Sequence, residues 1–212
     1  GGELYDYHGE CDLVLLDNPK FKNNLGMTVH IRTKIQDFWS SVSHAAVKIG
    51  DDFLELSGEE GKQWLWVNGE GNEDIQDKKW YRANLSGFLV RFKQTGPVRE
   101  VMIYLGGPEV LVMKTYHDFL RIDINWQGSE NYEGSFGLLG ARDLDGARVG
   151  RDHATVIDDV NAFGQEWQVT EADDKLFHDY DHAVMAPAKC VLPPTMTAEK
   201  LALRKRRLAE SD

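Results

Sequence analysis

Short apolar runs separated by polar or glycine-containing turns dominate the first 125 residues. In several runs apolar and polar positions alternate, as in antiparallel strands with one buried face, and helical periodicity is weak. The pattern predicts strands over residues 12–16, 27–33, 45–49, 53–56, 64–67, 87–92, 100–104, 110–113 and 119–124. Short strands repeated in this way are typical of an all-β, antiparallel β-sandwich, so we expect at least two packed sheets between residues 10 and 125.

After these strands the composition shifts toward glycine and aspartate. Residues 134–152 form a Gly- and Asp-rich stretch, which predicts an irregular loop. Residues 159–167 then predict one short helical turn that an aspartate caps. This turn is expected to close the β domain.

The pattern changes again beyond about residue 174. Three prolines interrupt any sheet there: Pro187, Pro193 and Pro194. Residues 197–208 predict a helix, with Thr197 as its N-cap and basic residues toward its C-terminal end. We therefore expect a β domain over residues 1–174, followed by a proline-containing linker and a C-terminal helix over residues 175–212.

Charge and cysteine content narrow the classes of function. A net charge of −11 repels a phosphate backbone, so nucleic acid is not an expected partner. We find no run of about 18 apolar residues that would predict a transmembrane segment, and no signal peptide at the start of the chain. The two cysteines, Cys11 and Cys190, are too few for a disulfide framework, which leaves one long-range disulfide or two thiols.

Three segments resemble a von Willebrand factor type D domain. Residues 5–15 have an aromatic-rich turn, the step Gly9-Glu10-Cys11 and an apolar strand, like the start of that family. Residues 137–140 and 161–167 follow in the same order as the family's later motifs, the second being similar to its closing Phe-Gly-x-x-Trp step. The resemblance covers roughly residues 1–170 and implies a twisted antiparallel β-sandwich from a secreted, adhesive, gel-forming or matrix protein.

The chain departs from the family in two places, at its opening motif and at its cysteines. The family's Gly-Asp-Pro-His opening is absent, as expected for a chain that begins inside the motif. Residues 137–141 have no cysteine where the family has Cys-Gly-Leu-Cys-Gly-Asn, so Cys11 lacks the partner that the resemblance implies. In an oxidising compartment Cys11 would then pair with Cys190. The alternative is that Cys190 pairs with a cysteine beyond Asp212 while Cys11 is a small buried side chain.

A calcium site is implied by the loop that holds calcium in many type D domains. In this chain the loop carries Asp143, Asp145 and Asp152, and calcium takes several oxygen ligands from such loops. The alternative is a solvated acidic turn, because Arg142, Arg148 and Arg151 neutralise the same carboxylates. Calcium is the one cofactor that we expect.

Two other sets of residues have both a structural and a functional interpretation. His178 and His182 have the i, i+4 spacing of a helical zinc site, but only two good ligands are visible, so we favour a surface histidine pair. Six tryptophans favour core packing over carbohydrate stacking. They are Trp39, Trp64, Trp66, Trp80, Trp126 and Trp167.

Two features expected at the surface concern the cellular compartment of the chain and its binding partners. Asn84-Leu85-Ser86 is an N-glycosylation sequon, which requires a secretory route. The basic residues of the expected tail helix would contact an acidic partner or a membrane surface, but a solvated helix face explains them more simply. They are Lys200 and residues 204–207.

We find no nucleophile elbow, zinc-protease helix or phosphate-binding loop in the sequence. The acidic pairs Asp51-Asp52 and Glu59-Glu60 would suit glycoside hydrolysis, but neighbouring residues of a strand point to opposite faces. We therefore expect a non-catalytic extracellular or cell-surface module that contacts other proteins or matrix. The alternatives are a carbohydrate-binding or glycoside-hydrolysing β-sandwich, and a scaffold domain whose neighbouring domains determine its activity.

Overall fold

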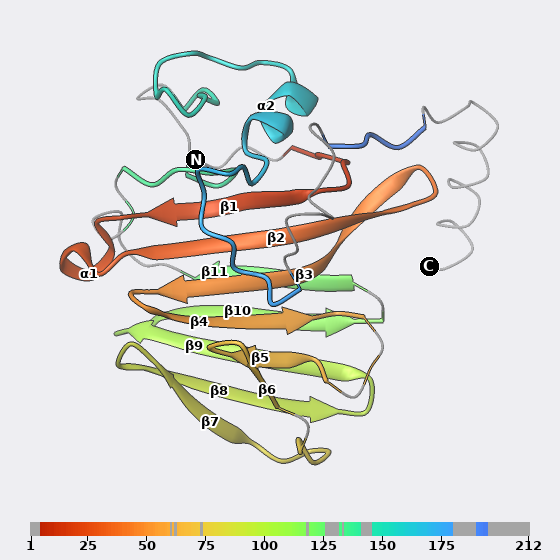
Figure 1. The fold of residues 1–212 in the computed structure, drawn as a ribbon, viewed down its shortest axis with the longest axis vertical. Helices are drawn as coiled ribbons and strands as arrows, with labels where there is room; N and C mark the ends of the chain where they lie inside the picture. Colours follow the sequence, from red (N-terminus) through yellow and green to blue (C-terminus); the bar gives the residue numbers. More distant parts are fainter. Residues whose placement is uncertain are drawn as a thin grey trace.

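Two antiparallel sheets pack face to face in the computed structural model, which describes residues 5–59, 61, 63–72, 74–117, 119–125, 132, 134–140, 146–179 and 190–194 (Figure 1). The first sheet follows chain order: β1 (Asp12–Asn18), β2 (Met27–Gln36), β3 (Trp39–Ile49), β4 (Asp52–Ser57), β5 (Leu65–Val67) and β6 (Glu70–Gly71). The second has the order β11 (Phe119–Asn125), β10 (Glu109–Tyr116), β9 (Val98–Gly106), β8 (Phe88–Thr95) and β7 (Tyr81–Leu85). The predicted all-β, antiparallel sandwich is confirmed.

Alternation along the strands builds the core between the sheets. On β4, Leu54 and Leu56 point into the core, whereas Glu55 between them lies on the outer face. On β9, Val101 and Ile103 are fully buried while Met102 is only half-buried. Because the side-chain period is two, a slip of one residue would expose every core residue of a strand, so this pattern fixes the register.

Nine strands were predicted, and each coincides with an observed strand, including the β3–β4 hairpin in which Ile49 pairs with Asp52. Several strands extend beyond the predicted bounds, and β3 begins at Trp39. The sequence did not predict β6 and β7. In β7 the polar residues Arg82 and Asn84 alternate with half-buried ones, and only Leu85 is fully buried, so the apolar signal is weak.

The described residues include two short helical elements, and no described helix is long and apolar enough to cross a membrane. The turn α1 (Phe21–Asn24) joins β1 to β2. The helix α2 (Val160–Glu166) begins after Asp159, whose carboxylate accepts a hydrogen bond from the Ala162 amide at 2.7 Å. This is the predicted aspartate cap, and α2 buries Phe163 in the core.

A segment without regular structure, residues 168–179, crosses the outer face of the first sheet. We call it the crossing segment; Figure 1 shows it in blue, running in front of β1, β2 and β3. It begins at β1, where Gln168 bridges to Leu13, and reaches β4, where His178 contacts Glu55. Between these points Leu176 and Phe177 pack on Ala46 of β3. The domain boundary expected near residue 174 falls within this segment, and the expected helix over residues 197–208 lies outside the described residues.

Candidate functional site

The outer edge of β1 brings together the three segments that resemble the type D family. Asp17 exchanges backbone hydrogen bonds with Phe136, and the amides of Leu138 and Leu139 donate to the carbonyls of Val14 and Leu15. Further along β1, the Val14 amide donates to the Trp167 carbonyl, and the Val169 amide donates to the Asp12 carbonyl. Residues from two distant parts of the chain therefore act together as an additional strand beside β1.

Each of these segments contains a glycine at a point of close contact. A Cβ on Gly137 would lie 2.8 Å from the Leu15 carbonyl oxygen, and Gly137 also has a positive φ of 91°. The Tyr7 side chain lies against the other two glycines. A Cβ would come within 2.1 Å of it at Gly9 and within 2.2 Å at Gly164. Gly137 is thus required by the backbone of β1, whereas Tyr7 packs against Gly9 of its own segment and against Gly164 of α2.

A disulfide joins Cys11 to Cys190 at the same edge, with the two Cα atoms 5.1 Å apart. This is the pairing expected once the family's own cysteine partner is absent. Beside it, Glu10 and Val191 form an antiparallel bridge. The disulfide spans 179 positions of the sequence and fastens the C-terminal part of the chain to the start of the first sheet.

The expected calcium loop is described only in part. Asp143 and Asp145 lie outside the described residues. The Asp152 carboxylate is exposed and accepts hydrogen bonds from the Thr155 hydroxyl and from the amides of Ala154 and Thr155. These bonds, first of all the one from the Thr155 side chain, lower the pKa of Asp152 to about 2. Asp152 therefore stabilises its own turn, and the calcium site remains a prediction.

Arg151 contacts partners other than the acidic loop. It binds the Asp173 carboxylate and donates to the carbonyls of Glu166 and Gln168. Arg148 donates to the carbonyl of Asp158. Among the described residues, these arginines thus fasten the loop to the backbone around α2.

The sequon lies in the β7–β8 hairpin. Asn84 is exposed, and its side-chain oxygen accepts a hydrogen bond from the Gly87 amide. Ser86 binds back to the first sheet, because its hydroxyl donates to the Ile49 carbonyl and its amide donates to the Asp52 carboxylate. Asn84 is accessible to modification, whereas Ser86 and Asp52 have structural roles.

Two of the described tryptophans, Trp64 and Trp167, belong to the hydrophobic core. Trp66 is buried on the outer face of the first sheet, Trp39 is half-buried, and Trp126 lies outside the described residues. Trp80 is 37% exposed, but the Arg91 guanidinium and the Lys93 ammonium both lie within 4.5 Å of its ring centre. Two cations thus occupy the ring surface that would stack on a sugar.

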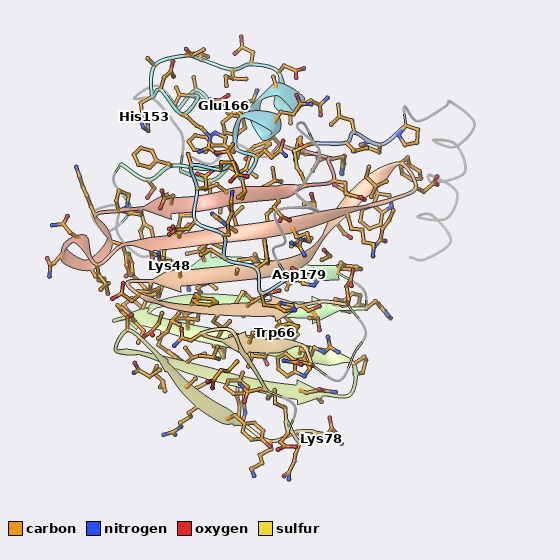
Figure 2. The ribbon with its side chains drawn as sticks, viewed as in Figure 1. Lys48, Trp66, Lys78, His153, Glu166 and Asp179 are labelled. Atoms are coloured by element: carbon orange, nitrogen blue, oxygen red, sulfur yellow. A yellow bond between two sulfur atoms is a disulfide. The ribbon has the colours of Figure 1, made fainter. Side chains whose placement is uncertain are left out.

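A cluster of polar residues that the sequence did not reveal lies at the end of the crossing segment. The Glu55 carboxylate accepts hydrogen bonds from the His178 amide at 2.7 Å and from its ring Nδ1 at 2.9 Å. The His178 ring stacks on Trp66 with the ring centres 3.9 Å apart. Figure 2 labels Trp66 and Asp179 close together at this end of the segment.

Arg32 and Asp12 extend this cluster toward β1. Arg32 donates from Nη1 to both oxygens of Asp179, and it binds Asp12 through Nε and Nη2. Although burial alone would raise it, the hydrogen bonds from Arg32 hold the pKa of Asp179 below its usual value. Burial raises the pKa of the Glu55 carboxyl, and the bonds from His178 act against this.

Of the surface histidine pair favoured from the sequence, the structure describes His178, which lies at the surface. The His178 side chain retains 31% exposure, whereas that of Glu55 retains none. His182 lies outside the described residues. Glu55 was missed because a glutamate between Leu54 and Leu56 looks like an ordinary solvent-facing strand residue. Only the crossing segment, more than a hundred residues later, buries it.

Comparisons with known proteins add no family to this description. A scan of the chain against protein-family models finds no match, and a search of curated proteins finds no significant match either. The likeness to the type D family therefore rests on residues 5–15, 137–140 and 161–167.

Proposed function

We propose that this chain is a non-catalytic extracellular module of the type D class that acts through contacts with other proteins or matrix. The observation that carries the proposal is the convergence of the three family-like segments on one edge of β1. The first segment, which includes part of β1, precedes the other two by more than a hundred residues, and all three meet at a single junction. Such agreement between sequence likeness and spatial proximity supports the type D interpretation.

The disulfide supports an extracellular location. Disulfides persist in oxidising compartments and are rare in the cytosol. The Cys11–Cys190 bond holds the start of the first sheet to the C-terminal segment, and the exposed Asn84 sequon is compatible with the same route. Both features suit a module that works outside the cell.

Residues suggested for glycoside chemistry have structural roles instead. Asp52 accepts hydrogen bonds from Ser86 in the β7–β8 turn and from Asn68 in the β5–β6 turn. These bonds join the two turns through Asp52. Glu59 forms an ion pair with Lys34 at 2.9 Å. The stacking surface of Trp80 faces Arg91 and Lys93. These contacts favour the adhesive module over the carbohydrate-active alternative.

The test is a parallel binding and turnover assay on the secreted chain. The chain, fused to a signal peptide and expressed in a eukaryotic secretory system, is immobilised and exposed to extracellular-matrix proteins, polysaccharides and chromogenic glycosides. We expect saturable binding to proteins, an intact Cys11–Cys190 bond and no glycoside turnover. Turnover, or saturable binding to polysaccharide alone, would overturn the proposal in favour of the carbohydrate-active β-sandwich.

An Asn84→Gln variant is the matched control. It removes the glycan acceptor while its longer amide side chain remains polar at an exposed position of the β7–β8 hairpin. If protein binding persists in this variant, the contact belongs to the polypeptide and not to a sugar attached at Asn84. Loss of all protein binding in Asn84→Gln would contradict recognition by the folded module.

A further inference from the structure

The cluster at the end of the crossing segment has the composition of a metal site. One ligand atom each from Glu55, His178 and Asp179 can be chosen so that all three lie within 4.8 Å of one another. The residues come from β4 and from the crossing segment, 123 positions apart in sequence. An imidazole nitrogen with two carboxylate oxygens is a donor set that zinc and related divalent transition metals bind.

Glu55 provides an independent reason to expect a ligand. Its side chain has no solvent exposure, and its Oε2 accepts both hydrogen bonds from His178. Its Oε1 is buried and has no hydrogen-bond partner within the part of the chain that the structure describes. A buried carboxylate oxygen is normally satisfied, because leaving it without a partner costs free energy. A metal ion bound by the carboxylate would remove this cost.

The surrounding residues hold the three ligands in place. The stacked Trp66 ring, at an interplanar angle of 15°, fixes the orientation of the His178 imidazole. Asp179 is held by Arg32, and Arg32 is held in turn by Asp12. Hydrogen bonds of this kind to metal ligands orient them and raise metal affinity.

The charges of the cluster also favour a dication. Among the described residues, Arg32 pairs with Asp12 and Asp179, and Glu55 pairs with His178. When the three carboxylates are ionised and His178 is neutral, as metal ligands must be, negative charge exceeds positive charge by two. One divalent ion would balance this excess.

We propose that Glu55, His178 and Asp179 bind one divalent transition metal ion, of which zinc is the probe, and that this ion fastens the crossing segment to β4. Nδ1 of His178 and Oε2 of Glu55 lie 2.9 Å apart, close to the roughly 3.3 Å that separates two ligand atoms in a tetrahedral site with bonds of about 2.0–2.1 Å. An ion held by both oxygens of the Glu55 carboxylate would therefore satisfy Oε1 and lie within reach of Nδ1 with little movement of either side chain. The proposal is independent of the adhesive function.

The test is a zinc titration of the full chain after chelator treatment and desalting. Isothermal titration calorimetry is run in excess calcium, so that the acidic loop does not contribute. We expect one zinc ion per chain, and at least about tenfold weaker binding in His178→Ala and in Glu55→Gln. The matched control is His117→Ala, which removes an exposed histidine from the β10–β11 turn and should bind zinc like the wild type.

Two results would overturn the proposal: a wild-type chain that binds no stoichiometric zinc, or a folded His178→Ala chain that binds it as tightly as the wild type. Near-ultraviolet circular dichroism establishes that each variant is folded. Should the variants fail to fold, zinc K-edge absorption on the wild type decides. A shell of nitrogen and oxygen near about 2.0–2.1 Å with a single imidazole supports the site. Two imidazoles or any sulfur ligand would exclude it.

Discussion

Arg151 binds the carboxylate of Asp173 with both terminal nitrogens, Nη1 to Oδ1 at 2.9 Å and Nη2 to Oδ2 at 3.1 Å. The same side chain donates from Nε to the Glu166 carbonyl and from Nη2 to the Gln168 carbonyl. One guanidinium thereby joins the loop after residue 146, the end of α2 and the crossing segment. Only arginine has the planar fork that makes all these contacts at once.

Replacing Arg151 with alanine should therefore lower the free energy of unfolding by about 2–3 kcal/mol, because the half-buried Asp173 loses a charge-assisted pair. Arg151→Lys should recover only part of the lost stability, since one ammonium group cannot donate to the Asp173 carboxylate and to both backbone carbonyls at once. Urea denaturation followed by tryptophan fluorescence measures both. The control is Arg121→Ala, which breaks the fully exposed pair with Asp123 and should leave stability unchanged. An equal loss of stability in Arg151→Ala and Arg121→Ala would contradict this prediction.

Gly137→Ala should destabilise the chain by more than about 2 kcal/mol, because a Cβ there meets the Leu15 carbonyl oxygen at 2.8 Å and φ is positive. Gly96→Ala is the matched comparison. Gly96 also has a positive φ, of 57°, but a Cβ there would meet nothing within 4 Å. Gly96→Ala should cost only about 1 kcal/mol from the backbone conformation. Thermal and urea unfolding of the two variants separate the packing cost at the β1 edge from the backbone cost.

His30 should make stability depend on pH in mildly acidic solution. Its ring is buried beneath the crossing segment, and burial lowers its pKa to about 4; Arg151 and Lys175 act in the same direction, whereas Asp173 and Asp174 oppose it. The unfolded chain, with the pKa of the ring at its ordinary 6.5, binds more protons between pH 6.5 and 4. Stability contributed by the neutral ring is thus present above pH 6.5 and is lost as the pH falls, by up to about 1.4 kcal/mol per pH unit.

The His30→Phe variant isolates this contribution. Urea unfolding at several pH values between 6.5 and 4.5 should give a shallower pH dependence for the variant than for the wild type, since other titrating groups are common to both. Parallel slopes would show that the His30 ring does not remain neutral in the folded chain.

Calcium should raise the melting temperature through the loop that contains Asp143, Asp145 and Asp152. An ion that binds only the native chain stabilises it by about 2.7 kcal/mol at a hundred times its dissociation constant. Asp145→Ala should remove this increment, as measured by calorimetry with calcium and with chelator. Asp152→Asn should also lower the melting temperature in chelator, because Asp152 stabilises its own turn. A wild-type melting curve that calcium leaves unmoved would exclude the site.

Nine of the eleven described strands could be predicted because each of them carries its own apolar pattern. Leu54 and Leu56 alternate with polar residues on β4, and Asp159 caps α2 within a single turn. Such local patterns fix the type of element and the buried face. The β7 strand was missed because its pairing with β8, and not its composition, stabilises it.

The site residues were less predictable, because their chemistry depends on contacts between distant parts of the chain. Neither Glu55 nor Arg32 is distinguished in the sequence, and their partners His178 and Asp179 follow more than a hundred residues later. The Cys11–Cys190 disulfide could be predicted only because two cysteines allow a single pairing within the chain. A charged side chain on the outer face of a strand is buried only if another segment covers it. The pattern of apolar and polar positions does not predict where that segment will lie.

The edge of β1 also has a consequence for synthesis of the chain. Strands β1 to β11 pair with sequence neighbours within each sheet, so both sheets can assemble as the polypeptide emerges. The outer edge of β1 pairs with residues 136–139 and 167–169, which are synthesised after the strands of both sheets. Until they arrive, the first strand presents unpaired amides and carbonyls to any other chain nearby. If translation pauses before residue 136, the nascent chain would therefore have a folded β-sandwich with an unpaired edge strand. Premature termination at this point should give aggregates and not soluble fragments.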